Sequence, residues 1–553
     1  MKLTGAQVIV ETLIEQGCDT VFGYPGGAVL VIYDELYKNS DRINHIITAH
    51  EQGAAHAADG YARVTGKVGV CIATSGPGAT NLVTGIANAY LDSTPLVAIT
   101  GNVPLSLLGR DSFQEVDIAG ITMPITKHNY IVKDVNDLAD VIREAFQIAK
   151  SGRPGPVLID IPRDVQTATC EFTKTDVVDR FPYPETDYEA LEKAVELINE
   201  SKKPYIYCGG GVVLSGAGDA VLEFAKKIDA PIGSSMMGLS AITADYKGTL
   251  GMTGMHGTYH ASKAKQEADL IIAVGVRFSD RATGNISKYS QNAKIIHIDV
   301  DSAEIDKNVS AYLGVVGNLT EVVTSLTEKV ESKTNVEWFA EIEKMKEYAK
   351  TSDEYKSKLV PRTIIEKVQE YTNPETVVAT DVGQHQMWTA QHYKFRKPRT
   401  FVTSGGLGTM GFGMGAAIGS CFGSNKNKTV LFTGDGSFGM NLNELATATS
   451  YDLPLVVVIM NNKVLGMVRQ WQSLFYGKRY SNTTLNRKTD FVKLANAFGA
   501  EGYRVTNVEE LEKALEKAFE ADTPVVLDCH IEMDELVLPM IPPGGSIDDI
   551  IVK

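Results

Sequence analysis

The chain has 553 residues, of which 44% are hydrophobic and 22% charged, which predicts a folded protein of two to four domains. Its formal net charge of −15 argues against binding to nucleic acid or to an anionic membrane, since both partners require a basic surface. The six cysteines are widely spaced and predict neither a zinc site nor a disulfide framework. With no apolar signal core and no apolar run of membrane-spanning length, we expect a cytoplasmic protein.

The first part of the chain alternates helical and strand-like segments. Thr-Gly-Ala-Gln from Thr4 is a capping box that predicts a helix ending near Gly17. Short apolar runs then predict strands at residues 43–48, 68–74 and 96–100. Strands that alternate with helices predict a parallel sheet covered on both faces, with ligands bound beyond the carboxyl ends of the strands.

Two charged stretches, residues 174–189 and 328–359, divide the chain into three parts. The predicted strands of the second part are 205–208, 270–274 and 295–298, and those of the third are 430–433 and 455–460. The expected fold is therefore α/β, with three doubly wound parallel-sheet domains at residues 1–175, 188–330 and 358–553.

The third part carries the most informative motif, Gly-Asp-Gly at 434–436 followed by Asn-Asn at 461–462. Both groups follow predicted parallel strands, so Asp435 and Asn462 are expected at the same edge of the sheet. A carboxylate and a carboxamide, completed by phosphate oxygens and water, suit the near-octahedral shell of Mg²⁺. Taken alone, however, Asp-Gly is more often a simple turn.

This motif resembles the signature of the thiamine diphosphate enzymes, in which some two dozen residues separate Gly-Asp-Gly from Asn-Asn; here residues 437–460 separate them. The resemblance favours a metal site over a turn. It implies a pyrimidine-binding domain, a middle domain and a diphosphate-binding domain, in that order. It also implies that Mg²⁺ is bound by the Asp435 carboxylate, the Asn462 amide oxygen and the backbone carbonyl near Val464.

Thiamine chemistry requires a carboxylate against the aminopyrimidine ring, as an acid and base placed by geometry and burial. Glu51 follows a predicted strand and begins a predicted helix, where a glutamate could also serve only the helix dipole. The surrounding A-H-E-Q-G-A-A-H-A-A-D-G-Y-A-R matches the catalytic glutamate segment of the family. The resemblance therefore implies that Glu51 is the catalytic carboxylate.

Two glycine-containing loops of the third part, residues 381–385 and 404–411, allow the backbone to approach a cofactor. In the family, a bulky apolar residue at the position of Met410 holds the cofactor bent, although a Met in such a loop is otherwise often a gap-filler. The residues assigned to thiamine diphosphate are Val382, Gly383, Gln384, His385, Gly408, Met410, Gly436, Ser437, Gly466 and Met467.

Seven blocks in order resemble one group of this family, the FAD-containing enzymes that join two 2-keto acids. They are Y-P-G-G-A, F-Q-E, I-T-K-H-N, G-M-H-G, R-F-S-D-R-A-T-G-N, G-Q-H-Q-M-W and G-M-V-R-Q-W-Q. The resemblance implies a transferase that decarboxylates pyruvate and condenses the remaining two carbons with pyruvate or 2-ketobutyrate, in valine, leucine and isoleucine biosynthesis. The alternatives are a thiamine and flavin enzyme such as pyruvate oxidase, a flavin-free catabolic member, or a binding protein without catalysis.

Such a condensation requires a cation for the carboxylate of the acceptor, and a guanidinium pairs bidentately with carboxylates. Taken alone, Arg281 would more simply form a surface ion pair. The resemblance implies that Arg281 binds the acceptor and that Trp471 and Met255 shape its alkyl pocket. A second rank of catalytic candidates, at the cofactor ring and the substrate entrance, comprises Gly27, Phe113, Gln114 and Lys127.

The middle part is expected to bind FAD as a structural group, because the net reaction is not a redox reaction. Its Gly-Gly-Gly at 209–211 lacks the full G-x-G-x-x-G fingerprint, so the motif alone is weak evidence. Asn318 and Ser279 stand where Asp is common in the family, which would weaken flavin binding. The residues that the resemblance assigns to FAD are Gly209, Gly210, Met255, His256, Gly275, Arg277, Arg281, Asp299, Asn318, Gln386 and Met387.

The resemblance also implies how chains associate. Relatives are homodimers or homotetramers in which Glu51 of one chain faces the diphosphate domain of another, so that active sites lie between chains. A small regulatory subunit is a further possible partner, whereas nucleic acid and membrane are not expected.

Overall fold

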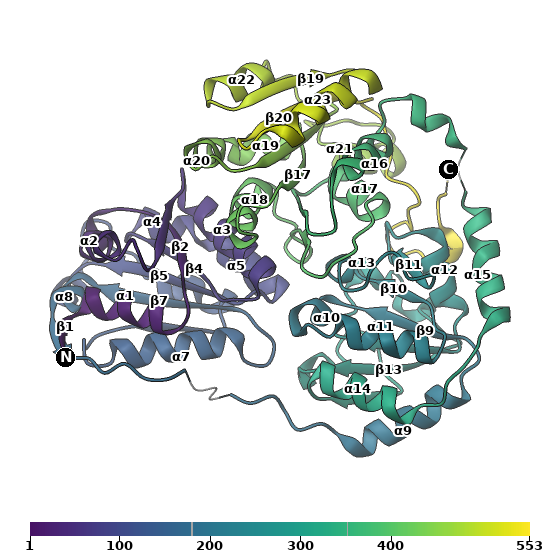
Figure 1. Ribbon diagram of the computed structural model, residues 1–553, viewed down its shortest axis with the longest axis horizontal. Helices are drawn as coiled ribbons and strands as arrows, with labels where there is room; N and C mark the ends of the chain where they lie inside the picture. The colour runs from purple at the N-terminus through teal and green to yellow at the C-terminus, as the bar shows by residue number, and fades with distance from the viewer. Residues whose placement is uncertain (178–180, 351, 553) are drawn as a thin grey trace.

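The computed structural model describes residues 1–177, 181–350 and 352–552, so parts of both charged stretches lie outside the described residues. Three six-stranded sheets follow one another along the chain, each parallel throughout (Figure 1). We call them the first, middle and third units. A short antiparallel pair, β1 (Lys2–Thr4) with β8 (Thr169–Glu171), adjoins the first unit. The α/β class with three parallel-sheet domains is therefore confirmed.

The first and third sheets have the same relative strand order, and the middle sheet has a different one. The first is β3 (Asn44–Ile47), β2 (Thr20–Tyr24), β4 (Gly69–Ala73), β5 (Leu96–Asn102), β7 (Pro156–Pro162) and β6 (His128–Ile131). The middle is β11 (Thr249–Met252), β10 (Ile232–Ser234), β9 (Pro204–Cys208), β12 (Leu270–Val274), β13 (Lys294–Asp299) and β14 (Leu313–Val316). The third is β16 (Phe401–Val402), β15 (Val377–Thr380), β17 (Thr429–Gly434), β18 (Leu455–Asn461), β20 (Val525–His530) and β19 (Glu501–Val505).

Helices connect the strands in every unit. Those of the first unit are α1 (Gly5–Glu15), α2 (Leu30–Lys38), α3 (Glu51–Thr65), α4 (Pro77–Asn81), α5 (Val83–Asp92), α6 (Ile118–Thr122), α7 (Leu138–Lys150) and α8 (Arg163–Thr167). The middle unit has α9 (Tyr188–Glu200), α10 (Gly210–Ser215), α11 (Gly218–Lys227), α12 (Tyr259–Glu267), α13 (Asp280–Thr283), α14 (Leu319–Lys329) and α15 (Val336–Tyr348). The third has α16 (Pro361–Tyr371), α17 (Gln384–His392), α18 (Phe412–Gly423), α19 (Asp435–Asn441), α20 (Leu445–Ser450), α21 (Gly466–Phe475), α22 (Phe491–Ala497) and α23 (Val508–Glu520).

Each sheet is buried on both faces, which explains why its strands are short continuous apolar runs. In β5, Val97 and Ile99 pack in the core that includes α1 and α7, whereas Leu96 and Ala98 pack in the core that includes α3. The predicted strands are confirmed to within a few residues at their ends. The Thr4 capping box is confirmed as well, with the Thr4 hydroxyl accepting the backbone N–H of Gln7.

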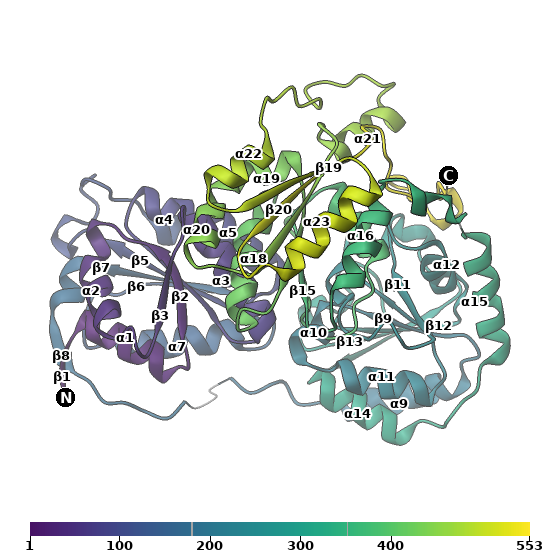
Figure 2. The same ribbon diagram turned by 45° about the horizontal axis from the view of Figure 1, so that its top comes forward.

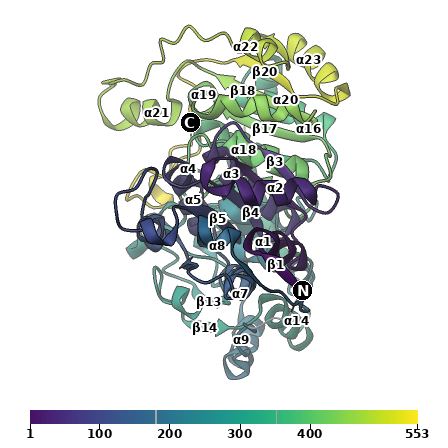
Figure 3. The ribbon, with the colours of Figure 1, turned by 90° about the vertical axis from the view of Figure 1, so that its left-hand side faces the viewer.

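The first and third units meet through helices α3 and α18, which lie side by side in Figures 1 and 3. Small residues make this contact possible: a Cβ on Gly60 would lie 2.2 Å from the carbonyl oxygen of Ala416, and one on Gly419 would lie 1.8 Å from that of Ala57. Near the end of α3, the buried Arg63 guanidinium donates to the Thr403 carbonyl at 2.9 Å. The two units therefore share one core.

The charged stretch at 328–359 contains a helix, α15, that packs against α12 of the middle unit (Figure 2). Trp338 is 2% exposed and donates its indole N–H to the Pro204 carbonyl at 3.1 Å. Ile342 is fully buried beside it. Among the described residues, no helix combines the length and apolar character needed to cross a bilayer.

Candidate functional site

A cavity of about 1530 Å³ opens at the carboxyl edge of the middle sheet and is also lined by residues of the first and third units. Strand β9 leads into it at Gly209, β12 at Gly275, and β13 ends at Asp299. The strand order reverses between β9 and β12, and parallel sheets bind ligands at such a reversal. The cavity is large enough for a cofactor and a substrate together.

All the residues that the sequence assigned to FAD line this one cavity. The backbone is closely packed at its floor, where a Cβ on Gly209 would lie 1.8 Å from the Gly275 carbonyl oxygen. Only a residue without a side chain fits there. The walls are mostly apolar, with polar groups from the strand ends, as expected for a nucleotide cofactor.

Two polar residues at this edge are held by their own loops. Burial raises the pKa of Asp299 to about 6, and its carboxylate accepts the backbone N–H of Asp301 at 2.9 Å. The Asn318 side chain caps α14, because its amide oxygen accepts the N–H groups of Thr320 at 3.0 Å and Glu321 at 3.2 Å. Asn318 is therefore held in place as the N-cap of α14. Ser279 lines the same cavity.

The three predicted acceptor residues come together at the mouth of the cavity, which all of them line. The Arg281 guanidinium carbon lies 5.8 Å from the centre of the Trp471 ring. Its only ion pair among the described residues is with the exposed Asp280 at 3.7 Å, and the Arg281 side chain remains 64% exposed. Met255 is fixed next to it, since its N–H donates to the Arg281 carbonyl at 2.8 Å. A cation with one weak, exposed ion pair thus lies beside a mostly apolar cavity.

The predicted metal ligands lie at adjoining strand ends in the third unit. Strands β17 and β18 are paired with Gly434 opposite Met460, which brings Asp435 and Asn462 to the same edge. Burial raises the pKa of Asp435 to about 6, a cost that a bound cation would remove. The Asn462 amide donates to Gln384 Oε1 at 3.2 Å, and its oxygen accepts the N–H of Val464 at 3.2 Å.

No group of three or more His, Cys, Asp or Glu side chains that could hold a metal occurs in the part of the chain that the structure describes. One carboxylate is nevertheless what Mg²⁺ requires when phosphate oxygens and water supply most of its shell. The surroundings fit a diphosphate as well. His385 is buried, its Nε2 has no partner among the described residues, and burial lowers its pKa to about 3, so the ring is neutral.

Glycine is required beside this edge. A Cβ on Gly466 would lie 1.9 Å from Gln384 Oε1 and 2.9 Å from the Asn462 amide nitrogen. Position 466 therefore has no room for a side chain unless Gln384 and Asn462 move. All three residues were predicted to bind the cofactor or its metal, and they lie in contact in the structure.

Asp381 is a residue whose role the sequence did not reveal. Its carboxylate accepts the N–H groups of Val382 and Gly411, both at 2.8 Å, and of Gly413 at 3.3 Å. These bonds fix the loop that carries Met410. A single Asp at a strand end gives no signal of such a role, because Gly411 and Gly413 lie 30 and 32 residues away in sequence.

Glu51 is the first residue of α3, as predicted, and lies at the carboxyl edge of the first sheet. Its carboxylate accepts a hydrogen bond from Asn81 at 2.9 Å. Gln114 is close by in a left-handed conformation (φ 60°) against Gly76, and Gly27 begins the short helical turn after β2. The side chain of Phe113 is 87% exposed. None of these four residues lines the large cavity of the same chain.

Lys127 lies elsewhere. Its amine donates to the carbonyls of Ile148 and Ser151 at the end of α7, the latter at 2.6 Å, and burial lowers its pKa to about 8. The hydrogen-bond partners of Lys127 therefore lie in the first unit near the end of α7, and Glu51 is not among them.

The cavity also has lining residues that sequence analysis missed. Arg153, on the loop before β7, pairs with the buried Glu304 at 2.7 Å, and both line the cavity. They join the first unit to the middle unit. Only the folded structure shows this pair, because the two residues are 151 positions apart.

Comparisons with known proteins agree with this architecture. Models of the thiamine pyrophosphate enzymes match residues 3–121 (N-terminal TPP binding domain), 191–326 (central domain) and 381–529 (C-terminal TPP binding domain). The chain is 45% identical to the probable acetolactate synthase large subunit of Methanocaldococcus jannaschii, over 99% of this chain and 95% of that protein. It is 46% identical to the acetolactate synthase large subunit of Corynebacterium glutamicum (99% and 90% covered). It is 44% identical to the acetolactate synthase isozyme 2 large subunit of Escherichia coli, with both chains fully covered.

Proposed function

Because the chain belongs to the acetolactate synthase large subunits of the thiamine pyrophosphate enzymes, we propose that it joins pyruvate to a second pyruvate or to 2-ketobutyrate in branched-chain amino-acid synthesis. The observation that carries the choice of substrates is the grouping of Arg281, Trp471 and Met255 at one cavity. The Arg281 guanidinium would pair with the carboxylate of the acceptor. The Trp471 ring and the Met255 thioether would contact its alkyl group.

Thiamine diphosphate, when bound, supplies the electron sink that a decarboxylation requires. We assign its metal, Mg²⁺, to Asp435, Asn462 and the Val464 carbonyl, and its diphosphate to the loops that begin at Val382 and Gly408. Met410 would support the rings from the loop that Asp381 holds in place. Glu51 would hold a proton against the pyrimidine nitrogen. The residues of the large cavity would hold FAD as a structural group.

We further propose that two chains complete each active site. Glu51 and Gln114 do not line the cavity that contains Arg281 and Trp471 in the same chain. The segment around Gln114 also leaves Phe113 and Met123 exposed, which suits contact with a second copy. A homodimer or homotetramer would bring Glu51 of one chain to the third unit of the other. A small subunit is a further partner, because the relatives are named large subunits.

The test of this function is an assay of the purified holoenzyme with pyruvate and 2-ketobutyrate, in which thiamine diphosphate, Mg²⁺ and FAD are omitted in turn. Both hydroxy-keto acid products should disappear without the first two. A bound flavin chromophore should be present and should remain oxidised during turnover. Acetyl phosphate formation that depends on phosphate and oxygen would instead identify a pyruvate oxidase and refute the proposal.

Replacing Trp471 by Leu should reduce the preference for 2-ketobutyrate over pyruvate by about tenfold, since one methylene in an apolar pocket is worth about 1–3 kcal/mol. Competition between the two acceptors, with both products quantified, measures the ratio directly. Phe475→Leu is the matched control, because Phe475 lies edge to face with Trp471 on the same helix but does not line the cavity. An unchanged ratio in Trp471→Leu would remove Trp471 from the acceptor pocket.

A further inference from the structure

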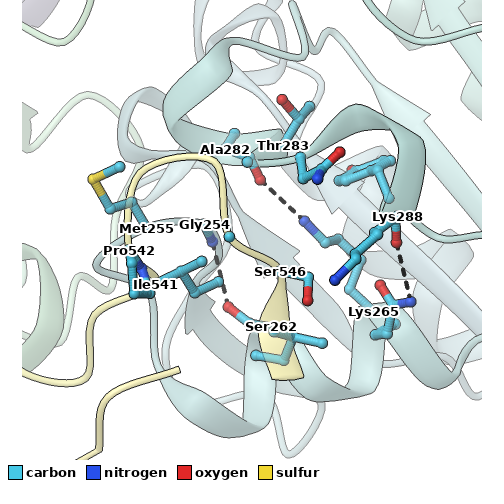
Figure 4. Close-up of a pocket in the computed structure, with 16 residues that line it drawn as sticks. Gly254, Met255, Ser262, Lys265, Ala282, Thr283, Lys288, Ile541, Pro542 and Ser546 are labelled. Carbon is cyan, nitrogen blue, oxygen red and sulfur yellow. Dashed lines mark hydrogen bonds between the residues drawn. The ribbon is translucent and has the colours of Figure 1, made fainter. Parts of the chain in front are cut away.

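A second, smaller pocket lies behind the acceptor residues and contains two lysines that the proposed function does not use. It has a volume of about 30 Å³ and is enclosed by α12, by the segment from Gly254 to Met255, by the region around α13 and by residues 541–547. Figure 4 shows the amine ends of Lys265 and Lys288 in this pocket, reaching it from different elements.

Lys265 lies on the buried face of α12, where an apolar side chain is expected. The buried residues of this helix are Ala261, Ser262, Ala264 and Lys265, and the lysine is 5% exposed. Its amine makes one hydrogen bond among the described residues, to the Ala282 carbonyl at 3.3 Å. It also lies 4.4 Å from the centre of the Tyr289 ring. A lysine is rarely buried this deeply without a carboxylate partner.

Neither lysine has such a partner among the described residues. No described carboxylate forms an ion pair with Lys265 or Lys288 within 4.0 Å. The carboxylate of Asp549, at the rim of the pocket, accepts the backbone N–H of Ser546 at 2.8 Å and its hydroxyl at 3.1 Å. These hydrogen bonds, with a smaller contribution from the charge of Lys288, lower the pKa of Asp549. By contrast Lys263, two positions before Lys265, pairs with Glu267 at 2.7 Å. The pocket therefore holds two amines, and neither has a described carboxylate within 4.0 Å.

We propose that this pocket binds one small monovalent anion of about the size of chloride, between the amines of Lys265 and Lys288. The volume of the pocket limits the size of the ligand, since a cavity of this volume holds roughly one or two water molecules. Phosphate and metabolite carboxylates are too large. Apolar walls from Ala282, Pro542 and Ile547 further favour a weakly hydrated halide over a strongly hydrated anion.

The anion would connect the segment 541–547 to the wall of the large cavity. The Ile541 N–H donates to the Met255 carbonyl at 2.8 Å, and the Asn285 N–H donates to the Gly545 carbonyl at 3.0 Å. Met255 and Ala282 line both the small pocket and the large cavity. By neutralising the Lys265 amine, the anion would therefore stabilise the packing of residues 541–547 against the middle unit. This effect does not depend on whether Arg281 binds an acceptor.

Binding should depend on pH in a defined direction. Burial lowers the pKa of Lys265 to about 7, so its amine is cationic below that pH and neutral above it. The Lys265 amine lies over the rings of Tyr207 and Tyr289, whose pKa values burial raises. Lys288 lines the same pocket, and the charged group near Lys288 is Asp549. Both tyrosines stay neutral across the range from pH 6.5 to 8.5. Anion affinity should therefore rise as the pH falls through 7.

The experiment is thermal unfolding of the holoenzyme in potassium glutamate, chloride or bromide at equal potassium concentration, at pH 6.5 and pH 8.5. Chloride and bromide should raise the midpoint at pH 6.5 by about 1–3 °C over glutamate, as expected for a ligand that binds the native state, and by less at pH 8.5. Lys265→Met should abolish this difference. Lys263→Met is the matched control and should retain it.

Lys288→Met provides a second variant, because this lysine is exposed and its loss should not affect folding. It should weaken the halide effect. In crystals soaked in bromide, an anomalous peak should lie between the two amines. A water at that place, or equal halide effects in the wild type, Lys265→Met and Lys288→Met, would overturn the proposal.

Discussion

Replacing Glu51 by Gln should lower turnover by about 10²–10⁴-fold, the range contributed by a positioned acid or base. The amide has nearly the shape of the carboxylate but cannot exchange a proton with the pyrimidine ring. Asn81, which donates to Glu51 at 2.9 Å, can donate equally well to the amide oxygen, so the start of α3 should keep its structure. The measurement is the rate of acetolactate formation at saturating pyruvate.

Thiamine diphosphate affinity and the unfolding midpoint of Glu51→Gln should remain close to those of the wild type. Glu11→Gln is the matched control, since Glu11 pairs with Arg42 on the surface of α1. Full activity in Glu51→Gln would exclude Glu51 as the catalytic carboxylate. Loss of activity together with loss of cofactor binding would instead indicate a structural role for the residue.

Replacing Asp435 by Asn should reduce Mg²⁺-dependent cofactor binding by more than about 10–100-fold, the loss typical of changes just outside a metal shell. Mg²⁺ takes one or two protein carboxylates, and Asp435 is the carboxylate at the same strand edge as Asn462. The neutral amide cannot balance the metal charge. Titration of the apoenzyme with thiamine diphosphate at several Mg²⁺ concentrations measures the effect.

The matched control is Asp452→Asn. Asp452 precedes β18 at the opposite, amino edge of the same sheet, and Asn tolerates its left-handed backbone (φ 47°). This control should bind the cofactor as the wild type does. If Asp435→Asn did so too, the metal would have to be held by other residues.

The sequence revealed those parts of the site whose signal is local. Gly-Asp-Gly and Asn-Asn each follow an apolar run, and pairing of β17 with β18 then brings Asp435 near Asn462 without further information. Glu51 was predicted at a helix start for the same reason. The residues assigned to FAD could be listed because their blocks resemble a known family, although the glycine turn at 209–211 lacks a complete fingerprint.

Contacts between distant segments could not be predicted in this way. Helix α15 could not be recognised within a charged stretch of the sequence. Its fully buried residues are Trp338 and Ile342, which are too few to form a clear apolar stripe. The pair of Arg153 with Glu304 depends on the docking of two units. Lys127 lies in a block that matches the family, yet its amine contacts the end of α7, a choice that its neighbours in sequence do not determine.

The contact between Ile541 and Met255 has a consequence for biogenesis. The middle sheet has all its strands once β14 is made, but the hydrogen bond that supports Met255 comes from a segment about half the chain later in sequence. During translation, the acceptor pocket must therefore remain unfinished long after the unit that contains it has formed. An incomplete polypeptide would have a folded middle unit with one wall missing.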